Sequence, residues 1–154
     1  MTKIAISIKN KNQRNCGECT KCCEGWLTAN INGEEMFPGK PCKFVNLNSG
    51  CSIYKKRPEE PCKTFECMWK GTNDSIMPNH FKPSISNVII TIQEINGISF
   101  HAMVNAGSDP SAEMVSWFTT FITAKRINGF WTVGKDSYWL GSSIFMQQFE
   151  NKHI

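Results

Sequence analysis

Long hydrophobic runs are missing from this 154-residue sequence. A membrane-spanning helix needs about 18 or more consecutive apolar residues, and a secretory signal needs an unbroken apolar core of about 7–15. The start of the chain instead alternates apolar and polar residues over positions 1–8. We therefore expect no membrane association and a cytoplasmic location, where a reducing environment keeps thiols free to bind metal.

Recognisable catalytic motifs are also missing. The sequence has no phosphate-binding glycine loop, no G-x-S-x-G nucleophile elbow and no pair of catalytic carboxylates. It has only three histidines, His80, His101 and His153, which we expect to be ordinary loop, strand and tail residues. The motifs therefore do not decide whether the protein is an enzyme.

Cysteine is absent after position 67 and concentrated before it. Four cysteines lie within residues 16–23, in the pattern C-x-x-C-x-x-C-C, and four more follow. Because thiolates are strong ligands for zinc and for iron–sulfur clusters, we predict that all eight bind metal. They are Cys16, Cys19, Cys22, Cys23, Cys42, Cys51, Cys62 and Cys67.

Three chemistries fit an even number of cysteines. A disulfide scaffold is the least suitable, because the dense cluster would strain most pairings. Zinc sites with four cysteines usually use turns of the C-x-x-C type, of which Cys16 and Cys19 supply one. Bacterial ferredoxins hold a four-iron cluster with C-x-x-C-x-x-C and a remote fourth cysteine, and residues 16–22 have that spacing without the Cys-Pro that completes the ferredoxin motif. The choice between an iron–sulfur cluster and Zn²⁺, and between one site and two, stays open.

Two details of the cysteine region add to this prediction. Side chains of adjacent residues point apart in most backbone conformations, so we expect Cys22 and Cys23 to serve different metals, or one to bind metal while the other packs. Tyr54 and Arg57 follow Cys51, and we expect them to shape the surroundings of the metal, with Arg57 donating hydrogen bonds to sulfur or to a carbonyl. The alternative is that Tyr54 packs and Arg57 bonds a loop.

The cysteine region resembles the YkgJ-like cysteine-cluster proteins, whose hallmark is the same C-x-x-C-x-x-C-C. The resemblance extends through Gly50-Cys51-Ser52-Ile53-Tyr54, Arg57-Pro58, Cys62 and Phe65-Glu66-Cys67, and covers about a third of the chain. It implies a zinc- or iron-chelating domain, sometimes described as an iron–sulfur oxidoreductase. A related region occurs in flagellin lysine methylases, but this chain has no nucleotide-binding glycine motif.

The formal net charge of +4 does not indicate a nucleic-acid partner. Eight thiolates on two dications would contribute four net negative charges, which leaves the metal-bound protein near neutral. Lys21, Lys43 and Lys63 stand beside cysteines, where a cation favours thiolate over thiol. The basic residues are therefore expected to compensate the metal site.

The second half of the sequence has regular periodicity. Two β-rich runs at 87–95 and 98–104 flank Asn96-Gly97 and predict an antiparallel hairpin. An apolar stripe then predicts a helix that begins with Asp109 as N-cap and Pro110 as first residue, and ends before Asn128-Gly129. A second hairpin is predicted at 130–140 and a short helix within 142–154.

The predicted fold class is α+β, in a single domain over residues 1–154. A Cys-rich, metal-stapled lobe at 11–72 packs on a small antiparallel sheet with one amphipathic helix at 84–141. A strand at 3–8, a hairpin around Asn32-Gly33, a short strand at 44–47 and a loop at 71–86 complete the prediction. Aromatic residues of the second half are expected to form its core, or, as an alternative, to bind a protein partner in a zinc-stabilised interaction module; they are Trp117, Trp131, Tyr138 and Trp139.

Overall fold

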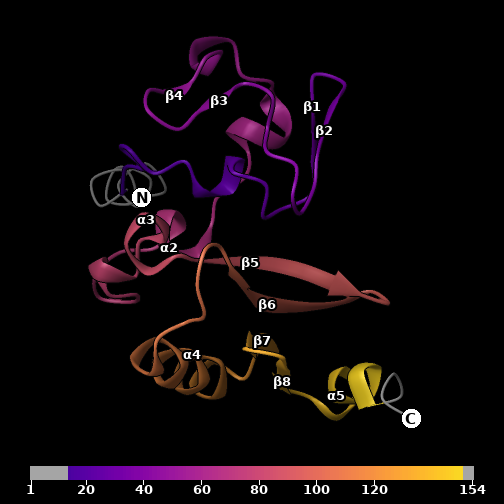
Figure 1. The fold of residues 1–154 in the computed structure, drawn as a ribbon. Coiled ribbons are helices and arrows are strands. Elements are labelled where there is room, and N and C mark those ends of the chain that lie inside the picture. Colours follow the sequence, from indigo (N-terminus) through magenta and orange to yellow (C-terminus); the bar gives the residue numbers. More distant parts are fainter. Residues whose placement is uncertain (1–13, 151–154) are drawn as a thin grey trace, which may run out of the picture. The chain divides into compact units, whose positions relative to one another are not determined.

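A computed structural model of the chain describes residues 14–150, so the strand predicted at 3–8 lies outside the described residues. The chain divides into two compact units, Met1–Ile85 and Ser86–Ile154. Helices and strands occur in both, so the predicted mixed α+β class is confirmed at that level (Figure 1). None of the described helices is long and apolar enough to cross a membrane.

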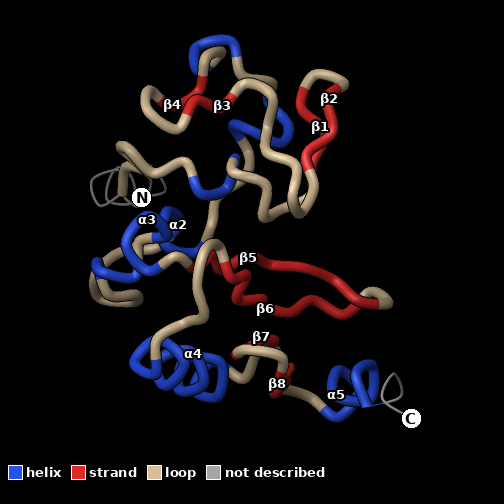
Figure 2. Tube along the Cα trace, in the orientation of Figure 1, coloured by secondary structure: helices blue, strands red, loops and turns tan. Residues whose placement is uncertain are grey.

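The N-terminal unit consists mostly of loops that join short elements (Figure 2). Asn32 and Gly33 both have positive φ and connect a hairpin, as their sequence predicts. Residues 71–86 were predicted to be a loop, which is wrong in part, because prolines start two short helical turns there. The elements are η1 (Lys21–Cys23), β1 (Ala29–Ile31), β2 (Glu34–Met36), β3 (Val45–Asn46), β4 (Gly50–Cys51), η2 (Tyr54–Lys56), η3 (Glu59–Lys63), α2 (Met68–Gly71), η4 (Asn79–Phe81) and α3 (Pro83–Ser86).

Cysteine is part of the apolar core of this unit. The core cluster centres on Ile31 and Met36 from the β1–β2 hairpin together with Cys42, and all three are buried. Cys23 and Cys62 pack against it, as do Leu27, Ala29, Phe44, Val45 and Ile53. The hairpin thus supplies one wall of the region in which these cysteines lie.

The C-terminal unit is a four-stranded sheet with two helices. The strands follow the order β5 (Val88–Ile95), β6 (Ile98–Asn105), β7 (Gly129–Val133) and β8 (Asp136–Leu140). Both hairpins are antiparallel, as predicted, whereas β6 and β7 run parallel because α4 (Ala112–Lys125) connects them. The predicted C-terminal helix is α5 (Ser143–Glu150).

Alternation along the strands directs the two helices to opposite faces of this sheet. Trp131 contacts Phe118 of α4, with ring centroids 5.7 Å apart. The next residue back, Phe130, belongs to the cluster on the other face, which forms around Phe145 of α5 and Phe100. Each face of the β6–β8 part of the sheet is therefore covered by its own helix.

Helix α4 ends at Lys125, before Asn128-Gly129 as predicted, but it begins at a residue other than the predicted one. Ser111 is the N-cap, and its hydroxyl accepts a hydrogen bond from the Met114 N–H at 3.1 Å. Asp109, the predicted cap, instead accepts a hydrogen bond from the side-chain amide of Asn105. At the other end Arg126 adopts left-handed backbone angles and caps the helix.

Candidate metal centre

The C-x-x-C-x-x-C-C segment folds as two successive tight turns. The Cys19 N–H donates to the Cys16 carbonyl at 2.9 Å, and the Cys23 N–H donates to the Thr20 carbonyl at 2.8 Å. The second turn is η1, and it leaves the sulfurs of Cys22 and Cys23 only 3.8 Å apart. The expectation that these side chains point apart is therefore wrong, because the two sulfurs are in contact.

All eight cysteines are free thiols in the structure, and none forms a disulfide. The sulfur contact between Cys22 and Cys23 raises the pKa of Cys22 and lowers the pKa of Cys23 to about 7. The thiol of one stabilises the thiolate of the other, so the pair gives up its first proton readily and its second with difficulty. A pair with one thiolate near neutral pH is ready to bind a cation.

Four thiols gather where the start of the described chain meets α2. Burial raises the pKa of Cys16 and of Cys67, and the charge of Cys19 raises both further. Cys22 is affected in the same way by Cys67 and by Cys16. These four sulfurs are therefore close enough for their charges to interact, although 51 positions separate Cys16 from Cys67 in the sequence.

Arg14 is the residue that brings these distant segments together. Its guanidinium donates to the Trp69 carbonyl at 3.0 Å, to Asp74 at 2.9 Å and to the Met77 carbonyl. It also lies over the ring of Trp69, 4.6 Å from the centroid. Because Arg14 is two residues before Cys16 and Trp69 is two residues after Cys67, this contact holds the two cysteines near each other.

Lysines supply positive charge at this first group. Lys82 forms an ion pair with Glu18, at 3.2 Å, and its ammonium lies 5.3 Å from the centre of the Trp69 ring. Lys70 and Lys82 both lower the pKa of Cys16, in opposition to the larger effect of burial. The first group is therefore surrounded by cations that favour thiolates.

The other four thiols gather in the core of the N-terminal unit. The Cys42 N–H donates to the Cys23 carbonyl at 2.9 Å, which joins two segments 19 positions apart. The short β3–β4 ladder places Cys51 opposite Val45, close to Cys42. Burial raises the pKa of Cys42 and of Cys62, and further increases come from Cys23 and Cys51 for both.

Backbone N–H groups surround one sulfur in each group. The N–H groups of Phe44 and Val45 lower the pKa of Cys42, and those of Lys70 and Trp69 lower the pKa of Cys67, each in opposition to burial. In both cases the donors are two and three residues after the cysteine. This is the turn that steadies the sulfurs of thiolate metal sites.

Tyr54 and Arg57 lie beside the second group. The guanidinium of Arg57 stacks on the ring of Tyr54, 3.9 Å from its centroid, and its Nε donates to the Tyr54 carbonyl at 2.9 Å. Arg57 also lowers the pKa of Cys23 and partly offsets the raised pKa of Cys62. Arg57 therefore bonds its own loop and contributes positive charge to the thiols, which combines the two roles considered for it.

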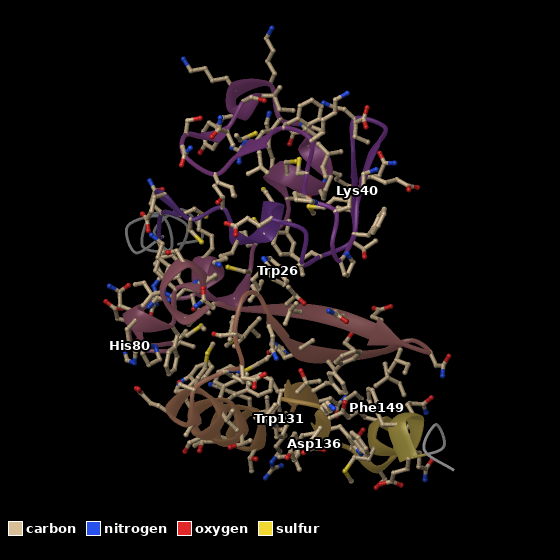
Figure 3. The ribbon with its side chains drawn as sticks, viewed as in Figure 1. Trp26, Lys40, His80, Trp131, Asp136 and Phe149 are labelled. Carbon is tan, nitrogen blue, oxygen red and sulfur yellow. The ribbon has the colours of Figure 1, made fainter. Side chains whose placement is uncertain are left out.

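The two described histidines contact aromatic rings. His80, labelled in Figure 3, contacts the ring of Phe81. His101 lies in the C-terminal unit against Phe121. His153 lies outside the described residues. Within residues 14–150, no three or more His, Cys, Asp or Glu side chains are spaced tightly enough to bind a single metal ion as they stand.

Aromatic residues of the C-terminal unit serve its core. Trp131 is buried and stacks on Tyr138, and Trp139 stacks on Phe149 (Figure 3). Tyr138 keeps 43% of its surface exposed. Sequence reasoning identified the aromatic residues, the cysteines and Trp69, which was expected to pack around the metal region, but missed Arg14 and Lys82; a basic residue just before the first cysteine was the signal for Arg14.

No protein-family model, no curated protein and no solved structure matches this chain, so the chemistry of these thiols is what points to a function.

Proposed function

We propose that this protein binds metal through the eight cysteines of its N-terminal unit, as an iron–sulfur protein. One observation carries the proposal: eight free thiols, spread over positions 16–67, come close enough for every one of them to interact with another. Clustered thiols are costly to ionise without a cation, whereas a metal replaces their protons and neutralises their charge. The resemblance to the YkgJ-like proteins supports the same function.

An iron–sulfur cluster is the better-supported occupant. Cys16, Cys19 and Cys22 have the ferredoxin spacing, and the charge interactions of Cys67 make it the remote fourth cysteine which that arrangement needs. A bound cluster would supply one-electron chemistry, which gives this proposal its redox role.

Zinc is the second candidate. The N–H groups that surround Cys42 and Cys67 favour it, since such turns hold the sulfurs of four-cysteine zinc sites. In a tetrahedral site with Zn–S bonds of about 2.3 Å the sulfurs are about 3.8 Å apart, so zinc binding would draw each group inward. The protein would then be a zinc-stabilised interaction module, with the aromatic C-terminal unit as the surface for a partner.

Anaerobic purification followed by metal and sulfide analysis tests the proposal. A brown protein that absorbs in the visible and contains iron and acid-labile sulfide is expected for a cluster. A colourless protein with stoichiometric zinc would select the second candidate. Protein purified anaerobically without either metal, and unable to bind iron and sulfide or zinc on reconstitution, would refute metal binding.

Chelation provides a second test. We expect removal of the metal to unfold residues 11–72, because a structural metal site contributes its binding energy to folding. Far-UV circular dichroism and limited proteolysis would detect the change. An apoprotein with an unchanged spectrum and unchanged protease resistance would show that the metal does not hold this unit together.

A further inference from the structure

We infer that the eight cysteines form two separate four-thiolate centres: Cys16, Cys19, Cys22 and Cys67 hold the first, and Cys23, Cys42, Cys51 and Cys62 hold the second. The inference rests on the proposed metal binding and specifies it, since neither the sequence spacing nor the resemblance assigns any cysteine to a site. Four thiolates close a site completely, so two such sets use every cysteine of the chain.

Contacts of Arg14 define the first centre. Its guanidinium donates to the Trp69 carbonyl and stacks on the Trp69 ring. This contact connects the residues just before Cys16 to helix α2, whose N-cap is Cys67. The turn closed by the Cys19 N–H and the Cys16 carbonyl then places Cys19 on the same side. Cys22 follows Cys19 at the same spacing of three residues, in the turn η1 that comes next.

Core packing defines the second centre. Cys23 and Cys62 pack against buried Cys42 in one apolar cluster. Cys51 joins them through β4, because the Ser52 N–H donates to the Phe44 carbonyl at 2.8 Å and fixes β4 beside the turn that follows Cys42. The charge interactions of Cys42 and Cys62 are with Cys23 and Cys51 and with each other.

Cys22 and Cys23 are the point where the two centres meet. Their sulfurs are 3.8 Å apart, but Cys23 packs in the core cluster with Cys42 and Cys62 and its carbonyl accepts the Cys42 N–H, whereas Cys22 is not part of that cluster. Three other thiols lie on each side, so if both residues bound at one centre, five thiols would lie there and only three at the other. The dipeptide therefore gives one ligand to each centre and holds the centres next to each other.

Formation of each centre is balanced in protons and charge. Each of the four thiols loses its proton to solvent as its sulfur–metal bond forms, so loading with a divalent ion releases up to four protons and gains two positive charges per centre. Nothing is oxidised or reduced in this step, and Co²⁺ can replace the native metal as a visible probe because cobalt also accepts four thiolates in a tetrahedron.

Paired cysteine replacements test the assignment. Under anaerobic conditions we expect the reduced apoprotein to bind two Co²⁺ ions per chain, and Cys16→Ser or Cys51→Ser to lower this to about one, since each removes one ligand from a closed set of four. Cys16→Ser with Cys19→Ser, both in the first centre, should lose no more than Cys16→Ser alone. Cys16→Ser with Cys51→Ser, one from each centre, should lose both ions.

Alkylation of the wild-type protein provides a test that needs no variant to fold. At half loading with Co²⁺, treatment with N-ethylmaleimide and peptide mapping would identify the shielded thiols. Shielding in the two assigned sets supports the inference, and shielding in any other grouping overturns it. A protein that binds metal with a different grouping refutes only this inference, whereas a protein that binds no metal refutes the proposed function itself.

Discussion

Gly25 offers a sharp test of how the second cysteine group is built. It has a φ of +91°, and a Cβ placed on it would lie 2.9 Å from the Pro41 nitrogen and 3.0 Å from the Lys40 carbonyl carbon. These are backbone atoms, which cannot rotate away as a side chain can. The same two segments are joined by the hydrogen bond from the Cys42 N–H to the Cys23 carbonyl. Gly25→Ala must therefore separate them.

The expected cost of Gly25→Ala has two parts. Holding a residue with a Cβ at this φ costs about 1–3 kcal/mol. Forcing a methyl group into filled space costs about another 1–3 kcal/mol. Together they amount to about 2–6 kcal/mol, a large part of the stability of a small domain. Moving Pro41 also shifts Cys42, so we expect the variant to lose metal from the second group and to keep metal in the first.

Gly39 supplies a matched control. Its φ is +93°, almost the same as that of Gly25, but a Cβ there meets nothing within 4 Å. Gly39→Ala should therefore cost only the conformational part, about 1–3 kcal/mol. Its backbone N–H remains available to donate to the Gly25 carbonyl, as it does in the native protein. The difference between the two variants isolates the clash with Pro41.

Hydrogen exchange measured by mass spectrometry would locate and quantify both effects, together with the metal content of each variant. Faster exchange in the peptides around Cys23 and Cys42 is expected for Gly25→Ala, to a greater extent than for Gly39→Ala. Equal destabilisation of the two variants would refute the steric argument. A destabilised Gly25→Ala protein that retains all of its metal would show that the close approach of Gly25 to Pro41 is not needed for metal binding.

Three further predictions concern the C-terminal unit and are measured as urea unfolding midpoints. Ser111→Ala removes the hydroxyl that accepts a hydrogen bond from the Met114 N–H, and should lower the free energy of unfolding by about 1 kcal/mol. Ser111→Asp, which can also cap the helix, should retain most of that stability. Gly129→Ala would place a Cβ 2.5 Å from the Ile122 Cδ1 atom and should cost about 1–3 kcal/mol; no loss would show that α4 can move away from β7. Burial lowers the pKa of His101 below its usual 6.5, so the unfolded chain takes up a proton at this residue more readily than the folded chain does. The free energy of unfolding should therefore be highest above about pH 6.5 and should fall as the pH drops below that value. His101→Gln should flatten that dependence, and an unchanged dependence would contradict the assignment to His101.

The C-terminal unit could be predicted well because its signals are local. Asn96-Gly97 and the alternating residues on either side determine a hairpin without help from the rest of the chain. The start of α4 could not be predicted as well. Asp109 and Ser111 are both good N-caps. The choice between them depends on Asn105, whose side-chain amide donates a hydrogen bond to the Asp109 carboxylate, while Ser111 caps the helix. That contact follows from tertiary structure and leaves no pattern in the sequence.

The cysteine region shows the same limit at longer range. The spacing of residues 16–22 predicts three ligands of a common site, but nothing in the spacing selects Cys67 as a neighbour. Cys67 comes near Cys16 because Arg14 contacts Trp69, which is 55 positions away in the sequence. Sequence reasoning also expected Cys22 and Cys23 to point apart, although the tight turn of η1 holds their sulfurs together. The candidate ligands can therefore be named from the sequence, whereas the grouping that we propose for them depends on the three-dimensional structure.

The two units also differ in what stabilises them. Four strands of five to eight residues and two helices allow the C-terminal unit to bury a continuous core. Within residues 14–85 the N-terminal unit has two short ladders, of three and two residue pairs, and isolated two-stranded ladders are marginal in water. Ordering each residue costs about 1–2 kcal/mol of backbone entropy, which this short-element unit must offset by other means. Thiolate–metal bonds are a strong interaction that eight cysteines could supply. Cys42 and Cys23 are already part of the small apolar core of this unit, so a bound metal would add to that core. If the protein binds metal as we propose, loading with metal would complete the fold of the N-terminal unit, and loading and folding would be one event.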